Sequence, residues 1–224
     1  MKIKSLAIAA ATLAVGAITS QAQVYSQNVV GYVNVIYPAG QFVMSANPLT
    51  TGNDVLTNVL QGVPGASHLY YWTGSTWATY QYSGVQHKWL NGVADVSNTN
   101  LAPGIGFFLV AQSNFTNTYA GTIVASTGGG HATNSLTTSL TPVGAPVPYG
   151  DVVTNSSTFN LTVSGSSTLQ TWNIANQTFD PVYQYSGVQH VWKQGTTVTN
   201  PVILVAQGFF ISAQAATNWI QTLQ

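Results

Sequence analysis

The sequence predicts an all-β protein of two tandem, internally repeated modules, each a β-sandwich or jelly-roll-like unit with one short helix at most. Short segments rich in Val, Tyr, Phe and Ile alternate with Gly-rich turns along most of the chain, a pattern typical of antiparallel sandwiches. The octapeptide YQYSGVQH occurs twice, at residues 80–87 and 183–190. Only residues 54–60 carry a helical pattern.

The chain begins with the layout of a secretory signal peptide. Lys2 and Lys4 precede an apolar run, and Ser20 and Ala22 supply the small residues of a cleavage site. The run covers only residues 6–18, whereas a membrane span needs roughly 20 residues. We therefore expect residues 1–22 to be removed near Ala22. The mature chain is then secreted, extracellular or at the cell surface, with the periplasm as the other compartment, and it is not inserted in a membrane.

The internal repeat divides the mature chain into two modules. Residues 54–58 match residues 151–155, and the Gly-Phe-Phe of residues 106–108 returns at residues 208–210. We expect a first β module at residues 23–125 and a second at residues 126–224. The second opens with the Ser-Thr-Gly-Gly-Gly joint of residues 126–130, whose composition is that of a flexible linker.

The strands and the helix follow from local patterns. The helix of residues 54–60 has one apolar side, Asn53 or Asp54 as its N-cap, and Gly62 at its end. Asp151 takes the same helix-start position in the second module. Strands are predicted at residues 28–37, 69–72, 76–82, 106–110 and 115–124, and then at 161–163, 170–174, 182–185, 188–192, 202–205, 208–213 and 218–223.

The charge inventory excludes several classes of function. The chain has no Cys, Arg or Glu; after cleavage two Lys and four Asp remain, a net charge of −2. Nucleic-acid binding needs many cations to neutralise phosphates, and a basic membrane-binding patch needs them too. Both are excluded here. Weak self-repulsion also favours self-association.

The octapeptide is predicted to form a hairpin with Ser83-Gly84 as a two-residue turn. That register opposes Tyr82 to Val85 and Tyr80 to His87, which places an aromatic row on one face of the sheet. Two interpretations remain open: the row is core, or it is a platform on which sugar rings stack. The residues that would contact a carbohydrate are Trp72, Trp77, Tyr80, Tyr82, Trp172, Tyr183 and Tyr185.

The sequence offers little evidence for a metal site or a catalytic site. No two of the four His fall at zinc-ligand spacing, and the four Asp are scattered rather than clustered as a calcium site requires. No G-x-S-x-G or H-E-x-x-H motif is present. We expect no cofactor, no metal ligands and no catalytic residues.

Three stretches carry a resemblance to a known family. They are Ala-Asn-Pro-Leu at residues 46–49, Leu-Tyr-Tyr-Trp at 69–72 and L-A-P-G-I-G-F-F-L-V at 101–110. The pattern resembles the uncharacterised β-sandwich modules of exported bacterial proteins, with an early N-P and a late A-P-G-x-G-F-F-V. The expected mature start S-Q-N-V-V-G-Y, residues 26–32, is similar to that of a set of small secreted bacterial proteins. The second module departs from the pattern, since Val-Ala-Gln at residues 205–207 replaces the Pro-Gly turn. The resemblance implies an extracellular accessory or structural module and supplies no catalytic residues.

These observations favour a non-enzymatic secreted protein with a structural or interaction role at the cell surface or in the extracellular matrix. Its partners would be other copies of itself or a neutral polysaccharide. The alternative is a carbohydrate-binding module that uses an aromatic strand face, and a third reading is a secreted hydrolase.

Overall fold

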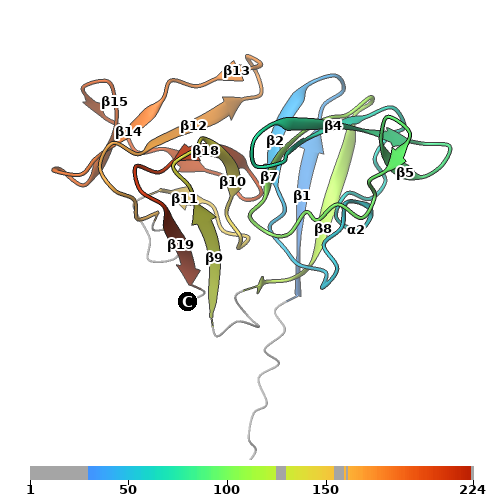
Figure 1. Cartoon of the computed structure of the whole chain (residues 1–224), viewed down its shortest axis with the longest axis horizontal. Helices are drawn as coiled ribbons and strands as arrows, with labels where there is room; N and C mark the ends of the chain where they lie inside the picture. The colour runs from blue at the N-terminus through green and yellow to red at the C-terminus, as the bar shows by residue number, and fades with distance from the viewer. Residues whose placement is uncertain (1–29, 125–129, 154–158, 160, 223–224) are drawn as a thin grey trace, which may run out of the picture.

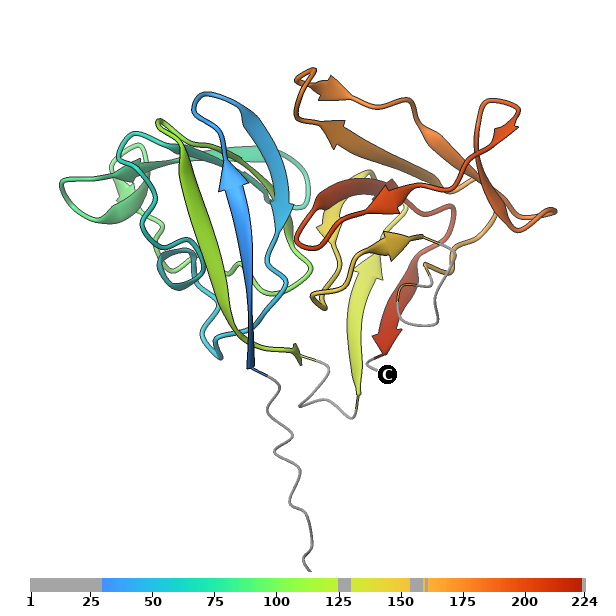
Figure 2. The ribbon, with the colours of Figure 1, turned by 180° about the vertical axis from the view of Figure 1, so that it is seen from behind.

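A computed structural model describes residues 30–124, 130–153, 159 and 161–222. The signal peptide and most of the predicted Gly-rich joint lie outside these residues. The described chain is all-β, as predicted, with several antiparallel sheets and one short helix. Residues 30–124, here called the first half, and residues 130–222, the second half, lie side by side (Figures 1 and 2).

The first half contains a six-stranded antiparallel sheet in the order β2-β7-β3-β4-β5-β6 and a separate antiparallel pair, β1 with β8. Side chains of both sheets meet in one core, where Tyr37, Leu69, Trp89 and Phe107 are completely buried. The elements are β1 (Val30–Tyr37), β2 (Phe42–Ala46), α2 (Leu56–Val59), β3 (His68–Trp72), β4 (Trp77–Ser83), β5 (Lys88–Asn91), β6 (Ala94–Asp95), β7 (Gly106–Val110) and β8 (Phe115–Thr122).

The second half has its main sheet in the order β10-β18-β12-β14-β15-β16, with β13 paired to the end of β12. Two further antiparallel pairs, β19 with β9 and β11 with β17, complete it. Its core surrounds Phe159, Trp192, Phe209 and Trp219. The strands are β9 (His131–Leu136), β10 (Thr141–Gly144), β11 (Asp151–Val152), β12 (Thr168–Asn173), β13 (Thr178–Phe179), β14 (Tyr183–Ser186), β15 (Val191–Gln194), β16 (Thr197–Val198), β17 (Val202–Ile203), β18 (Gly208–Ser212) and β19 (Thr217–Thr222).

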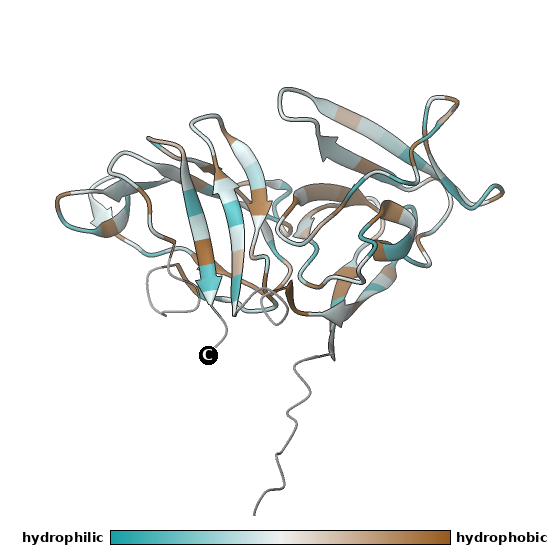
Figure 3. Cartoon of the chain, turned by 60° about the horizontal axis from the view of Figure 1, so that its bottom comes forward, coloured by the Kyte–Doolittle hydropathy of each residue, from teal (hydrophilic) through white to brown (hydrophobic). Residues whose placement is uncertain are grey.

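Alternation of buried and exposed residues explains why these segments are strands. Successive side chains of a strand point to opposite faces, and β8 alternates exposed with buried positions through Asn117 and Tyr119. Figure 3 shows hydrophobic and hydrophilic bands alternating along several strands. β7 and β18 instead bury four consecutive residues each, so both of their faces are covered.

The second covered face lies at the junction of the two halves. Backbone bridges join Ser45 to Gln207 and Ile105 to Val143. The N–H of Ala46 donates to the Ala206 carbonyl at 2.9 Å, and the N–H of Gly144 donates to the Gly104 carbonyl at 2.9 Å. β2 of the first half therefore contacts the loop before β18, while β10 of the second half contacts the loop before β7.

Glycines allow the two backbones to come this close. A Cβ on Gly106 would lie 2.7 Å from the carbonyl carbon of Pro142, and a Cβ on Gly208 would lie 2.8 Å from the carbonyl oxygen of Ser45. Both distances are shorter than real Cβ contacts. The glycine of each Gly-Phe-Phe segment is thus required by the junction.

The predicted helix is shorter than expected and capped differently. It covers Leu56–Val59, with Val55 at the N-cap position and no side-chain cap. The Asp54 carboxylate instead accepts hydrogen bonds from the Thr51 N–H at 2.8 Å and the Thr50 hydroxyl at 2.7 Å, which organises the preceding turn. Asp151 lies in β11, not at a helix start, and residues 154–158 lie outside the described residues.

Several strand predictions need correction. Residues 161–163 are not a strand, although Leu161 and Val163 are buried in the second core. The predicted strand of residues 188–192 begins only at Val191, as part of β15. Strands β2, β6, β9, β10, β11, β13 and β16 were not predicted. β2, β9 and β10 mix polar and small residues with apolar ones, so their period-2 pattern is weak, and the other missed strands have only two residues each.

Candidate functional site

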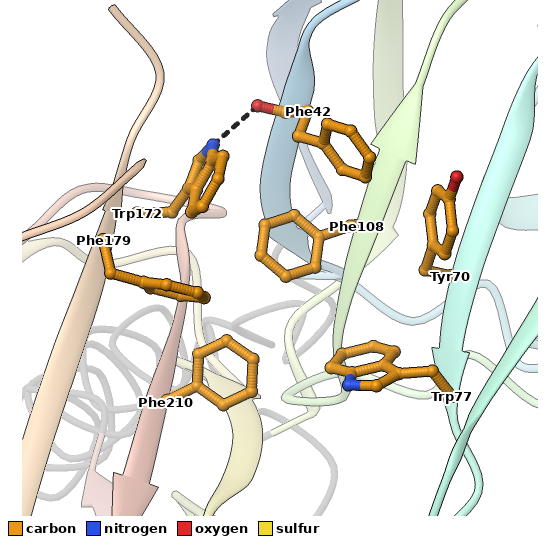
Figure 4. A pocket seen from close by; sticks show the side chains of 7 residues that line it. All are labelled: Phe42, Tyr70, Trp77, Phe108, Trp172, Phe179 and Phe210. Carbon is orange, nitrogen blue, oxygen red and sulfur yellow. Dashed lines mark hydrogen bonds between the residues drawn. The ribbon is translucent and has the colours of Figure 1, made fainter. Parts of the chain in front are cut away.

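Seven aromatic side chains from both halves form an open cavity of about 290 Å³ at the junction (Figure 4). We call it the aromatic cleft. The first half supplies residues from β2, β3, β4 and β7, and the second half supplies residues from β12, β13 and β18. The lining residues are Phe42, Tyr70, Trp77, Phe108, Trp172, Phe179 and Phe210.

The floor of the cleft follows from strand alternation in the two Gly-Phe-Phe segments. Phe107 and Phe209 each enter the core of their own half and are completely buried. Phe108 and Phe210, one residue later, point the opposite way and meet across the junction with ring centroids 6.1 Å apart. Both are buried, together with Met44, in a small third cluster.

The rim of the cleft consists of rings that remain partly in solvent. Phe42, Trp77 and Phe179 are 36%, 37% and 38% exposed. Most neighbouring rings meet edge to face or tilted, as Trp172 and Phe179 do at 4.8 Å and 78°, the arrangement that ring quadrupoles favour. The cleft therefore offers both ring faces and ring edges to a ligand.

A hydrogen-bond clamp fixes the position of Phe42 across the junction. The Gln177 side-chain amide accepts from the Phe42 N–H at 2.8 Å and donates to the Phe42 carbonyl at 3.3 Å. The Trp172 indole N–H donates to the same carbonyl at 2.8 Å (Figure 4). The Gln177 side-chain amide thus pairs with both backbone groups of Phe42, as a residue of a neighbouring strand would. These hydrogen bonds hold Phe42 in place on the rim.

The cleft contains no charged group. Asp180 follows Phe179 in the sequence, but its carboxylate accepts from the Thr171 hydroxyl at 2.8 Å and the Asn173 amide at 3.2 Å. The polar atoms of the seven lining side chains are the Tyr70 hydroxyl and the two indole N–H groups, and that of Trp172 is already engaged. The cleft can therefore offer apolar contact with few hydrogen bonds.

A second, more polar depression adjoins the cleft. Trp72 packs against Trp77 with ring centroids 5.3 Å apart and lines a cavity of about 290 Å³. Thr73, Ser135 and Thr141 line the same cavity, and the hydroxyl group of each donates a hydrogen bond within the protein. We call this cavity the Trp72 groove.

The octapeptide hairpin has a different register from the predicted one. Tyr82 lies opposite Trp89 and Ser83 opposite Lys88, so residues 84–87 form a four-residue loop. The two-residue turn was wrong, and His87 lies in the loop in the left-handed region, with φ of 53°. The second copy repeats this loop.

The close approach of Gly84 to Gly65 explains the longer loop. A Cβ on Gly84 would lie 3.1 Å from the Gly65 Cα. A backbone hydrogen bond from the Ala66 N–H to the Tyr82 carbonyl at 2.8 Å holds this crossing. The strand therefore passes the Gly65 loop before the chain reverses. Gly187 and Gly165 repeat the contact in the second half.

The seven residues proposed for carbohydrate contact separate into two groups. Trp77 and Trp172 line the aromatic cleft, and Trp72 lines the groove beside it. The four tyrosines lie on core-facing positions: Tyr80 is 7% exposed and belongs to the first core, and Tyr82, Tyr183 and Tyr185 pack partly buried against the two cores.

The sequence interpretation did not identify the other five residues of the cleft. Phe108 and Phe210 lie in strands that were predicted without assigning either residue to a site, and Phe42 lies in a strand that was not predicted. The usable signal was the run of two phenylalanines after a glycine in both copies, because adjacent apolar residues in one strand require cover on both faces.

Two buried tyrosines have strongly raised pKa values. The hydroxyls of Tyr37 and Tyr119 lie 2.8 Å apart, and the Tyr37 hydroxyl donates to the Ser45 hydroxyl at 3.0 Å. Burial raises the pKa of Tyr37 to about 12 and that of Tyr119 well above its usual range. Both stay protonated, which makes the pair structural.

Within the described ranges, no three His, Cys, Asp or Glu side chains gather as a metal site would require. The same ranges contain no helix with the length and hydrophobicity of a membrane span. Comparisons of the chain with protein-family models, with curated proteins and with solved structures found no match.

Proposed function

We propose that this protein is a non-catalytic, exported interaction protein that binds its partner at the aromatic cleft, at the cell surface or in the extracellular matrix. In this proposal it consists of two copies of one β-sandwich module. The matching chain order of the two main sheets supports the duplication, as do the glycine contacts that both octapeptide hairpins repeat.

The observation that carries the proposal is the partly exposed aromatic rim. Folding removes large apolar side chains from water, yet three aromatic rings of one cleft remain more than a third exposed. Apolar concave sites with a few polar atoms are the usual form of ligand pockets. The cleft also lacks any carboxylate, imidazole or aliphatic hydroxyl that could act as acid, base or nucleophile.

The test uses the purified chain of residues 23–224 incubated with cell envelopes and with insoluble polysaccharides. We expect retention on the cell envelopes, and loss of that retention for Phe179→Ala. Tyr32→Ala is the matched control, because Tyr32 is 77% exposed on β1, away from the cleft. Light scattering of the free chain tests self-association in parallel. Equal retention of both variants would contradict a role for the cleft.

Carbohydrate binding is the second candidate, and the Trp72 groove favours it. An indole ring beside hydroxyl-bearing side chains suits a sugar, which needs both an apolar contact and hydrogen bonds. A binding assay on neutral polysaccharides should then show loss for Trp72→Ala with little change for Phe179→Ala. The reverse order would assign the binding to the aromatic cleft. A secreted hydrolase, the third reading, gains no support from the described residues.

A further inference from the structure

We infer that the aromatic cleft binds a small, uncharged, apolar ligand, an aryl ring system or a short alkyl chain, held between the two halves. The inference rests on the proposed function, because it names the ligand class of the same cleft. Polarity, size and the origin of the lining residues support it.

The polarity of the walls excludes charged and highly hydroxylated ligands. A hydroxyl or a charge that enters the cleft loses its hydrogen bonds to water. Seven aromatic side chains offer almost nothing in exchange, and an uncompensated polar group is unfavourable in such surroundings. Asp180, the carboxylate nearest in sequence, is already bound by Thr171 and Asn173. A sugar is therefore better placed in the Trp72 groove than in the cleft.

The size of the cleft favours a small molecule over a protein. Its volume of about 290 Å³ corresponds to about ten water molecules at roughly 30 Å³ each, which suits a fused ring pair or a short chain. A stable protein interface uses about 20–30 residues on each side, whereas seven residues line this cleft. A second copy of the chain would thus find too little surface here.

The origin of the lining residues links ligand binding to the junction. Trp77 and Phe108 come from the first half, and Phe179 and Phe210 from the second. A ligand among them contacts both halves at once and finds its site only while the halves are together. Binding must therefore stabilise the folded, closed arrangement by mass action.

The test is a titration of the mature chain with N-phenyl-1-naphthylamine, a neutral aryl probe whose fluorescence rises in apolar surroundings. We expect saturable binding that naphthalene displaces, and a melting temperature that rises with probe concentration. Phe179→Ala should weaken binding about tenfold, the effect of roughly 1.4 kcal/mol, while Tyr32→Ala leaves it unchanged. Because Phe179 is on an exposed rim, this variant should fold, and circular dichroism checks that it does.

Competition experiments on the unaltered chain test the ligand class without any variant. Naphthalene should displace the probe, whereas naphthalene-2-sulfonate and cellobiose should not. Displacement by the sulfonate at the same concentration as naphthalene would overturn the inference, and so would the absence of saturable binding. If the probe fails but retention on envelopes still depends on Phe179, the ligand class is wrong and the proposed function stands. Saturable probe binding without such retention would support the ligand class and contradict the proposed function.

Discussion

The junction can be tested at one pair of residues, Ala46 and Gly144. They take equivalent places in the two halves: Ala46 lies opposite Gly106 in the β2–β7 pair, and Gly144 lies opposite Gly208 in the β10–β18 pair. The two residues face each other across the junction, and a Cβ on Gly144 would collide with the Cβ of Ala46. The junction therefore has room for one methyl group at this point.

Gly144→Ala should destabilise the chain strongly. The added methyl must push β2 and β10 apart, and overpacking of this kind typically costs about 1–3 kcal/mol. The backbone N–H groups of Ala46 and Gly144 also donate hydrogen bonds across the junction, each worth about 0.5–1.5 kcal/mol net. We expect a loss of about 2–6 kcal/mol in the free energy of unfolding.

Ala46→Gly should rescue this loss. Alone it removes one buried methyl and loosens a strand residue, which costs about 1–2 kcal/mol. In the double variant the methyl has merely moved from one side of the junction to the other. A Cβ at residue 144 would then keep one close neighbour, the Gln207 carbonyl oxygen at 3.3 Å. The double variant should therefore lie within about 1 kcal/mol of Ala46→Gly alone.

The assay is urea unfolding followed by tryptophan fluorescence and circular dichroism, with equal m-values as the check that the same surface unfolds. Gly31→Ala is the matched control, since its Cβ would meet only the Leu49 side chain at 4.0 Å, and it should be neutral or slightly stabilising. A double variant no more stable than Gly144→Ala would refute the junction geometry, because losses that simply add mean that the two residues do not touch.

Three further predictions follow from the packing and the pKa shifts. Gly84→Ala should cost about 1–3 kcal/mol of unfolding free energy in the same urea assay, since its Cβ would lie 3.1 Å from the Gly65 Cα; an unchanged midpoint would contradict the crossing. The hydrogen bond from Lys88 lowers the pKa of Asp95 to about 2, so its contribution is present above the unfolded pKa of about 4 and is lost as the pH falls through 2. The NMR shift of the Asp95 carboxyl carbon should titrate with a midpoint near 2. A midpoint near 4 would exclude the ion pair of Asp95 with Lys88. Burial raises the pKa of Tyr37 to about 12, so its contribution is complete below about pH 10 and is lost as the pH rises through 12. Phenolate absorbance should then show at least one hydroxyl that ionises only with unfolding.

The sequence was informative where apolar and polar side chains alternate along a strand that buries one face. Phe115–Thr122 alternates cleanly, and the prediction of residues 115–124 found it. The sequence was uninformative where the structure depends on which partner a polar side chain binds. Asp54 looks like a helix cap, but it binds the turn of Thr50 and Thr51, a choice that local sequence does not determine because the same residue types serve both roles.

The hairpin register is likewise not determined by local sequence, because it depends on a contact with a segment earlier in the chain. Ser83-Gly84 is a plausible two-residue turn by local rules. Gly84 is instead required because the Gly65 backbone passes close to it, and a Cβ on Gly84 would lie 3.1 Å from the Gly65 Cα. Because the side-chain period of a strand is two, moving the turn changes which residues share a face. His87 consequently lies in an exposed loop rather than beside Tyr80.

The aromatic cleft could not be predicted from either half alone, because it forms where equivalent faces of the two halves meet. Phe108 is covered on the junction side by Phe210 and Trp172. The paired positions around it differ between the halves: Trp72 lies opposite Trp77, and Trp172 lies opposite Phe179.

In the two-module interpretation, the duplication and the cleft have one physical cause. The second phenylalanine of each Gly-Phe-Phe segment points away from its own core, so a single module would leave it in water. Two modules cover each other's phenylalanine, and the glycine of each segment lets their backbones meet. The two halves cannot be perfectly symmetric, because the junction has room for only one methyl group between residues 46 and 144. Two copies of the first module would place Ala46 against Ala46, so the second copy must differ from the first at this point. The repeated octapeptide maintains the fold of each copy, while the site lies on the opposite face of the same sheets.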